Sequence, residues 1–341
     1  MPLWIVVLLA YTFEFANGWT DAPNSIATVV STRVMRPFTA VAMAAVLNLV
    51  GALAGTAVAK TIASGIVNPD YVTLETIAAA LLAAIIWALG AQYFGLPSSE
   101  SHALVAGLLG AGFAAGGLEA LEWSGTEKAL KGLVISPVGG FLAGFILMVL
   151  IYRIFRRVRR HTVSRIFGRG QVFSAGFMAF SHGTNDAQKS MGIITLAILI
   201  ADTGTVPQEF EIPNWVIVSA ALVIAAGTMV GGWRVIRTMG MRMTHLEPVH
   251  GFAAETGAAT VITTAAHFGI PVSTTHAIGT SIMGVGSTKR FSAVRWGVAG
   301  QVVSAWVLTW PSCMVMGFFL GKFLNAVFCP FGVLRRRRCP R

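Results

Sequence analysis

The chain has 341 residues, of which 55% are hydrophobic and only 11% are charged, and its mean hydropathy is +0.71. A soluble domain of this length would carry roughly 25% charged residues, so the composition excludes an ordinary soluble fold. The apolar runs are continuous rather than alternating, which favours membrane-spanning helices over an outer-membrane barrel. The sequence therefore predicts an all-α membrane protein with the lipid bilayer as its solvent.

The net charge of +11 would suggest nucleic-acid binding in a soluble protein. Here the basic residues gather between apolar runs, as the positive-inside rule expects, most densely at 153–169. We interpret this cluster as a cytoplasmic loop and expect no nucleic-acid partner; an RNA- or lipid-binding patch is the alternative. Cys313, Cys329 and Cys339 lack the spacing of a zinc site or a disulfide framework, so we expect no metal centre.

The first apolar run starts without the basic flank of a signal peptide, so we expect it to be retained as a membrane element. A polar stretch at 16–25 interrupts this run, and Gly18 and Pro23 predict a broken helix there. Broken helices expose unpaired N–H groups that suit an oxyanion. Asp21 falls near the bilayer centre, where an ionisable group costs roughly 2.5–3.5 kcal/mol. It should therefore face a cavity or a partner, unless it is a structural helix cap.

Two later segments each hold two apolar arms around a proline and several hydroxyl side chains, at 72–118 and at 249–288. Each is predicted to be a re-entrant hairpin, in which the proline ends one arm and the hydroxyls begin the next. The hydroxyls can donate hydrogen bonds to an oxyanion, although N-capping without substrate contact is the alternative. They are Ser98, Ser99 and Ser101 in the first hairpin and Ser273, Thr274 and Thr275 in the second.

Internal duplication relates the two parts of the chain. FANGWTDAPNS at 15–25 recurs as FSHGTNDAQKS at 180–190, and GLPSSESHA at 95–103 recurs as GIPVSTTHA at 269–277. Two motifs that recur in the same order with matched spacing indicate a tandem repeat. We therefore predict a first repeat at 1–155, a basic cytoplasmic linker at 156–170, a second repeat at 171–328 and a basic C-terminal tail at 329–341.

Charge predicts how the repeats are oriented. With the basic clusters inside and the acidic stretches outside, the two repeats cross the membrane in opposite directions and their hairpins lie on opposite sides. This is the inverted-repeat plan of secondary transporters. Arg335 to Arg338 disagree, because they would lie outside unless the tail re-enters. The predicted crossings are 1–32, 38–60 and 132–152 in the first repeat and 171–201, 214–231 and 293–325 in the second.

The motifs GWTDAPNS and HGTNDAQKS, together with LPSSESHALVAG, IPVSTTHAIGTS and the stretch 231–256, resemble the duplicated signature of the inorganic phosphate transporter (Pit) family. The resemblance covers nearly the whole chain. It implies an inverted-repeat fold in the cell inner membrane, symport of inorganic phosphate with a cation, and a homodimer. It also implies a substrate site lined by Asp21, Asn24, Ser25, Ser99, Ser101, Asp186, Lys189, Ser190, Ser273, Thr274 and Thr275.

The coupling cation is expected to be a proton or sodium. The second repeat has Lys189 where the first has Asn24, and His182 where the first has Asn17. An ammonium group beside Asp186 would occupy the space of a sodium ion or pair with phosphate, which leaves sodium possible near Asp21. The residues expected to couple the cation are Asp21, Asn17, Asn185, Asp186, Glu14, Glu100 and Glu255, of which the three glutamates could instead have structural roles.

The predicted function is secondary active symport of phosphate by alternating access. No P-loop is present and no covalent chemistry is expected, so the chain should be neither an ATP-driven pump nor an enzyme, and it should need no cofactor. A sulfate or other tetrahedral-oxyanion permease of the same fold is the closest alternative. The duplicated buried aspartates argue against an anion channel, because fixed negative charge repels a permeating anion. A phosphate receptor would bind without uptake.

Overall fold

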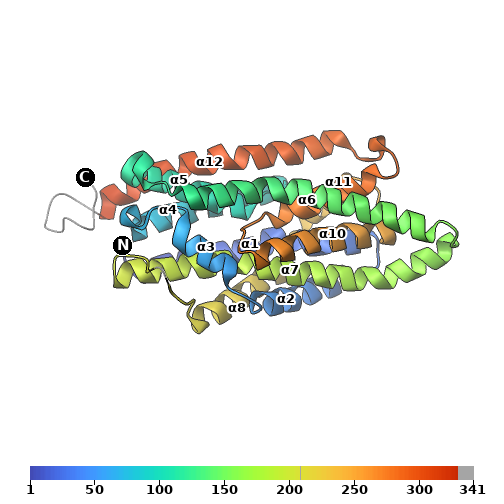
Figure 1. The fold of residues 1–341 in the computed structure, drawn as a ribbon, viewed down its shortest axis with the longest axis horizontal. Coiled ribbons are helices and arrows are strands. Elements are labelled where there is room, and N and C mark those ends of the chain that lie inside the picture. The colour runs from blue at the N-terminus through green and yellow to red at the C-terminus, as the bar shows by residue number, and fades with distance from the viewer. Residues whose placement is uncertain (208, 329–341) are drawn as a thin grey trace.

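The computed structural model describes residues 1–207 and 209–328, which form a bundle of helices (Figure 1). We call the first six helices the first half: α1 (Leu3–Ser31), α2 (Pro37–Ala52), α3 (Ala57–Gly65), α4 (Leu74–Phe94), α5 (Glu100–Gly116) and α6 (Trp123–Phe155). The second half is α7 (Arg160–Asp202), α8 (Asn214–Val230), α9 (Trp233–Arg237), α10 (Pro248–His267), α11 (Thr274–Ser287) and α12 (Trp296–Phe328). Short turns η1 (Pro69–Tyr71), η2 (Gly117–Ala120), η3 (Thr238–Arg242) and η4 (Phe291–Ala293) lie between them.

The lengths and compositions of the helices confirm the predicted fold class. Among the described residues, five helices are long and apolar enough to cross a membrane, or up to seven spans if each of two bent pairs counts as one. The only β-type pairing in these residues is an isolated bridge between Val67 and Leu121. The chain is therefore an all-α membrane protein.

The break expected within 16–25 is wrong. Helix α1 continues through Pro23, and α7 continues through the equivalent motif at 180–190. Proline removes one backbone hydrogen bond, and the packing of α1 against α4, α7 and α8 holds the rest of the helix. The breaks lie instead in the next element of each half, where α2 and α3 form a pair bent by 70° and α8 forms a pair bent by 61° with the segment Trp233–Arg242.

The basic linker is shorter than predicted. The turn between α6 and α7 spans 156–159, and the rest of the expected linker forms the first turns of α7. Arg159 is the N-cap residue of α7. The predicted C-terminal tail, 329–341, lies outside the described residues.

Helices of each half pack against helices of the other half. Helix α6 packs against α10 and α11 of the second half, and α12 packs against α4 and α5 of the first. Likewise α1 packs against α8, and α7 packs against α2. In Figure 1 the chain runs from left to right along α6 and from right to left along α12. Each half therefore completes the other, and the interface between them lies at the centre of the bundle.

Both predicted hairpins are pairs of helices, α4–α5 and α10–α11, each joined by a short loop. In Figure 1 the first pair lies towards the left of the bundle and the second towards the right. Their tips meet, because the Ser101 hydroxyl donates to the Val272 carbonyl at 3.0 Å and the rings of His102 and His276 lie 4.6 Å apart. Hydroxyl side chains from both halves are thereby brought to one place.

Glycine residues in the duplicated motif let neighbouring helices approach α1 and α7 closely. Gly18 of α1 lies against the backbone carbonyl of Ile224 in α8, and Gly183 of α7 lies against that of Asn48 in α2. A side chain at either glycine would collide with that backbone. Small residues serve this purpose at membrane helix crossings. Gly18 thus acts in packing, where the sequence suggested a helix break.

A buried polar site between the two halves

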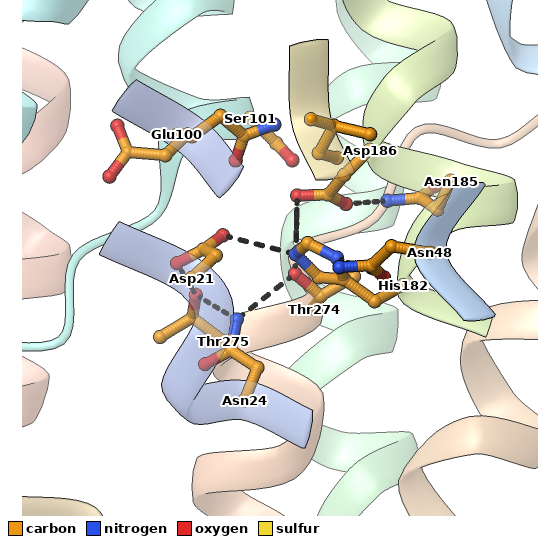
Figure 2. A network of polar contacts seen from close by, with 12 residues as sticks. Asp21, Asn24, Asn48, Glu100, Ser101, His182, Asn185, Asp186, Thr274 and Thr275 are labelled. Atoms are coloured by element: carbon orange, nitrogen blue, oxygen red, sulfur yellow. Dashed lines mark hydrogen bonds and ion pairs between the residues drawn. The ribbon is translucent and has the colours of Figure 1, made fainter. Parts of the chain in front are cut away.

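The site lies where the middle of α1 and the middle of α7 meet the tips of the two hairpins (Figure 2). Its charged and polar side chains are almost completely buried. Isolated charges are costly in such a place, so each must find a partner within the protein or in a bound ion. The members are Asp21, Asn24, Glu100, Ser101, His182, Asn185, Asp186, Lys189, Thr274 and Thr275.

Asp21 and Asn24 of α1 bind the tip of the second hairpin. The Asn24 amide donates to the Thr275 hydroxyl at 3.0 Å and to Thr274 at 3.3 Å, and the Thr275 hydroxyl donates to Asp21 at 3.0 Å (Figure 2). Asn24 Oδ1, by contrast, is buried without a hydrogen-bond partner, as are both side-chain polar atoms of Asn17 and the hydroxyl of Ser25. This side of the site therefore offers spare oxygen atoms.

Asp186 and Lys189 of α7 form the other side of the site. The Lys189 ammonium lies 2.8 Å from Asp186 Oδ2 and donates to the Ser101 hydroxyl of the first hairpin at 2.7 Å. The Asn185 amide donates to Asp186 Oδ1 at 2.7 Å and to the Val272 carbonyl at 2.9 Å. Lys189 is only 1% exposed, so its charge is compensated inside the protein.

His182 lies between the two aspartates. Its Nε2 atom is 3.5 Å from Asp186 Oδ2 and 3.9 Å from Asp21 Oδ2. One ligand atom from each of these residues lies within 4.8 Å of the others, which is close enough to hold a cation. Figure 2 shows all three side chains pointing towards one another. Sequence reasoning noted His182 as a departure between the repeats but did not place it in the site.

A chain of hydrogen bonds fixes the orientation of His182. The Thr228 hydroxyl donates to the Ile224 carbonyl, so it accepts the bond from the Asn48 amide at 2.9 Å. The Asn48 oxygen is then left to accept from Nδ1 of His182 at 3.0 Å. In a neutral imidazole this assigns the lone pair to Nε2, which faces the two carboxyl groups. A proton or a metal cation between these groups would relieve the resulting repulsion.

Asn48 was missed because its motif is not duplicated. It is a lone amide in the apolar run 38–59, and the signal that could have found it is its polarity at membrane depth. Thr20 was likewise missed; its hydroxyl donates to Glu100 at 3.1 Å. Glu100 therefore lies beside the site, and it also accepts from Ser98 at 3.2 Å.

Glu14 and Glu255 lie away from the centre. Glu14 accepts a hydrogen bond from Ser190, and Glu255 accepts from Thr28 and Ser174. Seven residues separate Glu14 from Asp21 and Asp21 from Thr28, so each carboxyl lies about 10 Å along α1 from Asp21, in opposite directions. Ser99 and Ser273 cap α5 and α11 by accepting from the backbone N–H groups of His102 and His276, at 3.3 and 3.2 Å.

A many-helix membrane protein with a buried, charge-bearing site between two halves has the build of a membrane transporter. The chain belongs to the phosphate transporter family PHO4, whose profile matches residues 17–162 and 155–317. It is therefore a phosphate transporter of this family and a multi-pass membrane protein.

Individual relatives agree with this assignment. The chain is 46% identical over 312 residues to a "probable low-affinity inorganic phosphate transporter" of Rhizobium meliloti (strain 1021), covering 91% of this chain and 93% of the relative. It is 42% identical over 328 residues to a protein of the same description from Bacillus subtilis (strain 168), covering 95% and 97%. A solved structure described as "the sodium-dependent phosphate transporter" matches with a TM-score of 0.87 and 26% identity, covering 95% of this chain and 99% of that one.

Proposed function

We propose that the protein imports inorganic phosphate across the cell inner membrane by secondary active symport with a cation, either a proton or sodium. The observation that carries this proposal is the buried site itself. It joins carboxyl, amide, hydroxyl and ammonium groups from both halves at the centre of the bundle. Such a site can hold an anion and a cation together, which is the requirement for symport. No covalent step is involved.

The transport cycle we propose is alternating access between two inverted repeats, at 1–155 and 171–328. The exchange of packing partners supports it, because α6 and α12 each pack on the opposite hairpin and run in opposite directions (Figure 1). Rocking of one half against the other would open the site alternately to the two sides. The hairpins would re-enter the membrane from opposite faces. A homodimer remains part of this proposal.

Phosphate would bind between the two helices and the two hairpin tips. The third N–H of Lys189 can donate to its oxygens, and Asn24, Ser101, Thr274 and Thr275 can do so by exchanging their present acceptors for phosphate. The carboxyl groups of Asp21 and Asp186 can accept from the P–O–H groups of protonated phosphate. Sulfate has no such donor at neutral pH, and leaving a buried acceptor unpaired costs about 1–3 kcal/mol. The site therefore favours phosphate over sulfate.

The test is uptake of radiolabelled phosphate into proteoliposomes that contain the purified protein. Proton and sodium gradients are imposed separately, and sulfate is added as a competitor. Uptake above that of protein-free vesicles, driven by at least one gradient and resisting equal sulfate, is the expected result. Phosphate binding without net uptake would identify a receptor. Equal inhibition by sulfate and unlabelled phosphate would identify a general oxyanion permease.

A further inference from the structure

Lys189 and Asn24 occupy equivalent places in the two halves. The duplicated motif aligns them, and their hairpin partners Ser101 and Thr275 are aligned by the second motif. The Lys189 ammonium is 2.7 Å from the Ser101 hydroxyl, and the Asn24 amide is 3.0 Å from the Thr275 hydroxyl. Each half therefore presents one side-chain nitrogen to the hairpin of the other half. In the first half it is neutral and in the second it is charged.

The site has two half-sites, one around Asp21 in α1 and one around Asp186 in α7. They differ in the ligand atoms that they offer a cation. Asn17, Asp21 and Asn24 lie on one face of α1, since they are separated by four and three residues. The oxygen atoms of Asn17 and Asn24 are buried and unpartnered. The equivalent positions in α7 are His182 and Lys189, which offer no oxygen at all. Lys189 instead places its own positive charge 2.8 Å from Asp186.

Charge balance explains the effect of having Lys189 in the second half where the first half has Asn24. Asp21, Asp186 and a phosphate anion bring at least three negative charges into a buried region, where uncompensated charge is costly. The ammonium compensates one of them and cannot diffuse away, one mobile cation compensates a second, and the remaining charge faces the N–H and O–H donors of the site. A further cation about 4 Å from it would be repelled by roughly 4 kcal/mol at an effective dielectric constant of 20. The second half-site is thus closed to a mobile cation, whereas the first is open.

We propose that Lys189 is a tethered counter-cation that permanently replaces one mobile cation of the phosphate site. This inference rests on the proposed symport and states how many cations that symport takes at this site. A single mobile cation, held near Asp21, accompanies each phosphate. Replacing the ammonium by an amide would open the second half-site and make transport depend on one more cation.

The test exploits the equivalence of the two half-sites. Lys189→Asn gives the second half the amide that the first half has, and Lys189→Leu removes the charge without supplying an oxygen. Uptake in proteoliposomes is measured over a range of sodium concentrations at constant pH. We expect Lys189→Asn to be nearly inactive without sodium and to recover by on the order of tenfold or more with sodium. Lys189→Leu should remain inactive at all sodium concentrations.

A double variant, Asn24→Lys with Lys189→Asn, moves the tethered charge to the other half and should lose the additional sodium requirement. If Lys189→Asn instead raises the KM for phosphate with no gain of sodium dependence, Lys189 serves only as a phosphate ligand and replaces no cation, and the proposal is overturned. The wild type provides a check that needs no variant to fold. Its uptake should depend on whichever cation drives it, proton or sodium, with a Hill coefficient no greater than about one, and a value near two for that cation would also overturn the proposal. Absence of all uptake by the wild type would instead contradict the proposed function.

Discussion

Asp21 and Asp186 are equivalent in sequence but have different partners. Asp21 accepts from Thr275 and has no cationic lysine beside it, whereas Asp186 pairs with Lys189 at 2.8 Å. We predict that Asp21→Asn and Asp186→Asn each abolish most phosphate uptake, because each removes a negative charge that balances the cations of the site. Only Asp186→Asn should also lower the melting temperature in detergent, since it strands a buried ammonium, a change that typically costs 3–5 kcal/mol.

Uptake into proteoliposomes and melting of the purified variants check this pair of predictions. Wild-type uptake by both variants would remove the two aspartates from the site. Equal melting temperatures for the two variants would show that Lys189 does not rely on Asp186 for compensation.

Asn48 provides a second prediction at the level of single residues. Its oxygen accepts from Nδ1 of His182 and so turns Nε2 towards the two aspartates. Asn48→Leu is close in volume but cannot accept a hydrogen bond. We expect uptake to fall by roughly 10–100-fold, the usual range for residues that orient a site histidine. Thr228→Val is the matched control, because it removes the support of Asn48 but leaves its oxygen, and it should reduce uptake less. Equal loss in both variants would indicate general damage to packing.

The sequence predicted the residues of this site to the extent that they lie in duplicated motifs. Asp21, Asn24, Asp186, Lys189 and both hairpin tips converge in the structure as expected. Asn48 was not predictable in this way, because its contact with His182 depends on how α2 crosses α7. Composition and periodicity carry no information on such a crossing.

At the scale of helices, the prediction of a broken α1 failed because helix propensity is a weak guide inside a packed bundle. Gly18 was interpreted as a helix breaker, but its missing side chain makes room for the backbone of α8. The actual bend between α8 and α9 occurs at Gly231, which has a φ of +71° that favours glycine. Whether a glycine bends a helix or makes room for a neighbouring backbone can be decided only when the helices that pack against it are known.

Gly18 therefore yields a prediction about packing. Gly18→Ala would place a methyl group against the Ile224 carbonyl, so α1 and α8 would have to move apart. Overpacking of this kind typically costs 1–3 kcal/mol, and a lower melting temperature in detergent is expected. Gly90→Ala in α4 is the control, because no atom lies within 4 Å of the added carbon. That variant should be neutral or more stable, since alanine favours a helix over glycine by roughly 1 kcal/mol. Similar destabilisation by both substitutions would contradict the close-packing role of Gly18.

At the scale of the whole molecule, continuous apolar runs predicted the helical membrane class, and duplicated motifs led us to expect two repeats. They could not predict that α6 and α12 each pack on the other half's hairpin. That exchange depends on contacts between segments far apart in the sequence, such as the one between Tyr152 and His250, and these contacts exist only in the folded protein. In the alternating-access cycle that we propose, this exchange would couple motion of either half to the hairpin of the other half, whose tip lies beside Asp21 and Asp186.

The driving ion is a property of the whole molecule, and we predict that a proton gradient drives uptake at least as well as a sodium gradient. Sodium requires several oxygen ligands in a compact cavity. At the half-site around Asp186, Lys189 supplies only N–H donors and a positive charge. Protons have more places to bind. Three buried glutamates, Glu14, Glu100 and Glu255, are distributed along the helices on either side of the centre, and none of them forms a salt bridge with a lysine or arginine among the described residues.

The measurement compares two sets of proteoliposomes. One has an inward sodium gradient at symmetric pH, and the other has no sodium and an alkaline interior. The external pH is the same in both, so that the ionisation of external phosphate does not differ between them. Faster or equal uptake with the alkaline interior is expected. The relative described as sodium-dependent is only 26% identical, and the prediction distinguishes this chain from that behaviour. Strict dependence on sodium, with no response to the proton gradient, would show that the first half-site around Asp21 alone determines the coupling ion and that the buried glutamates carry no protons in the cycle.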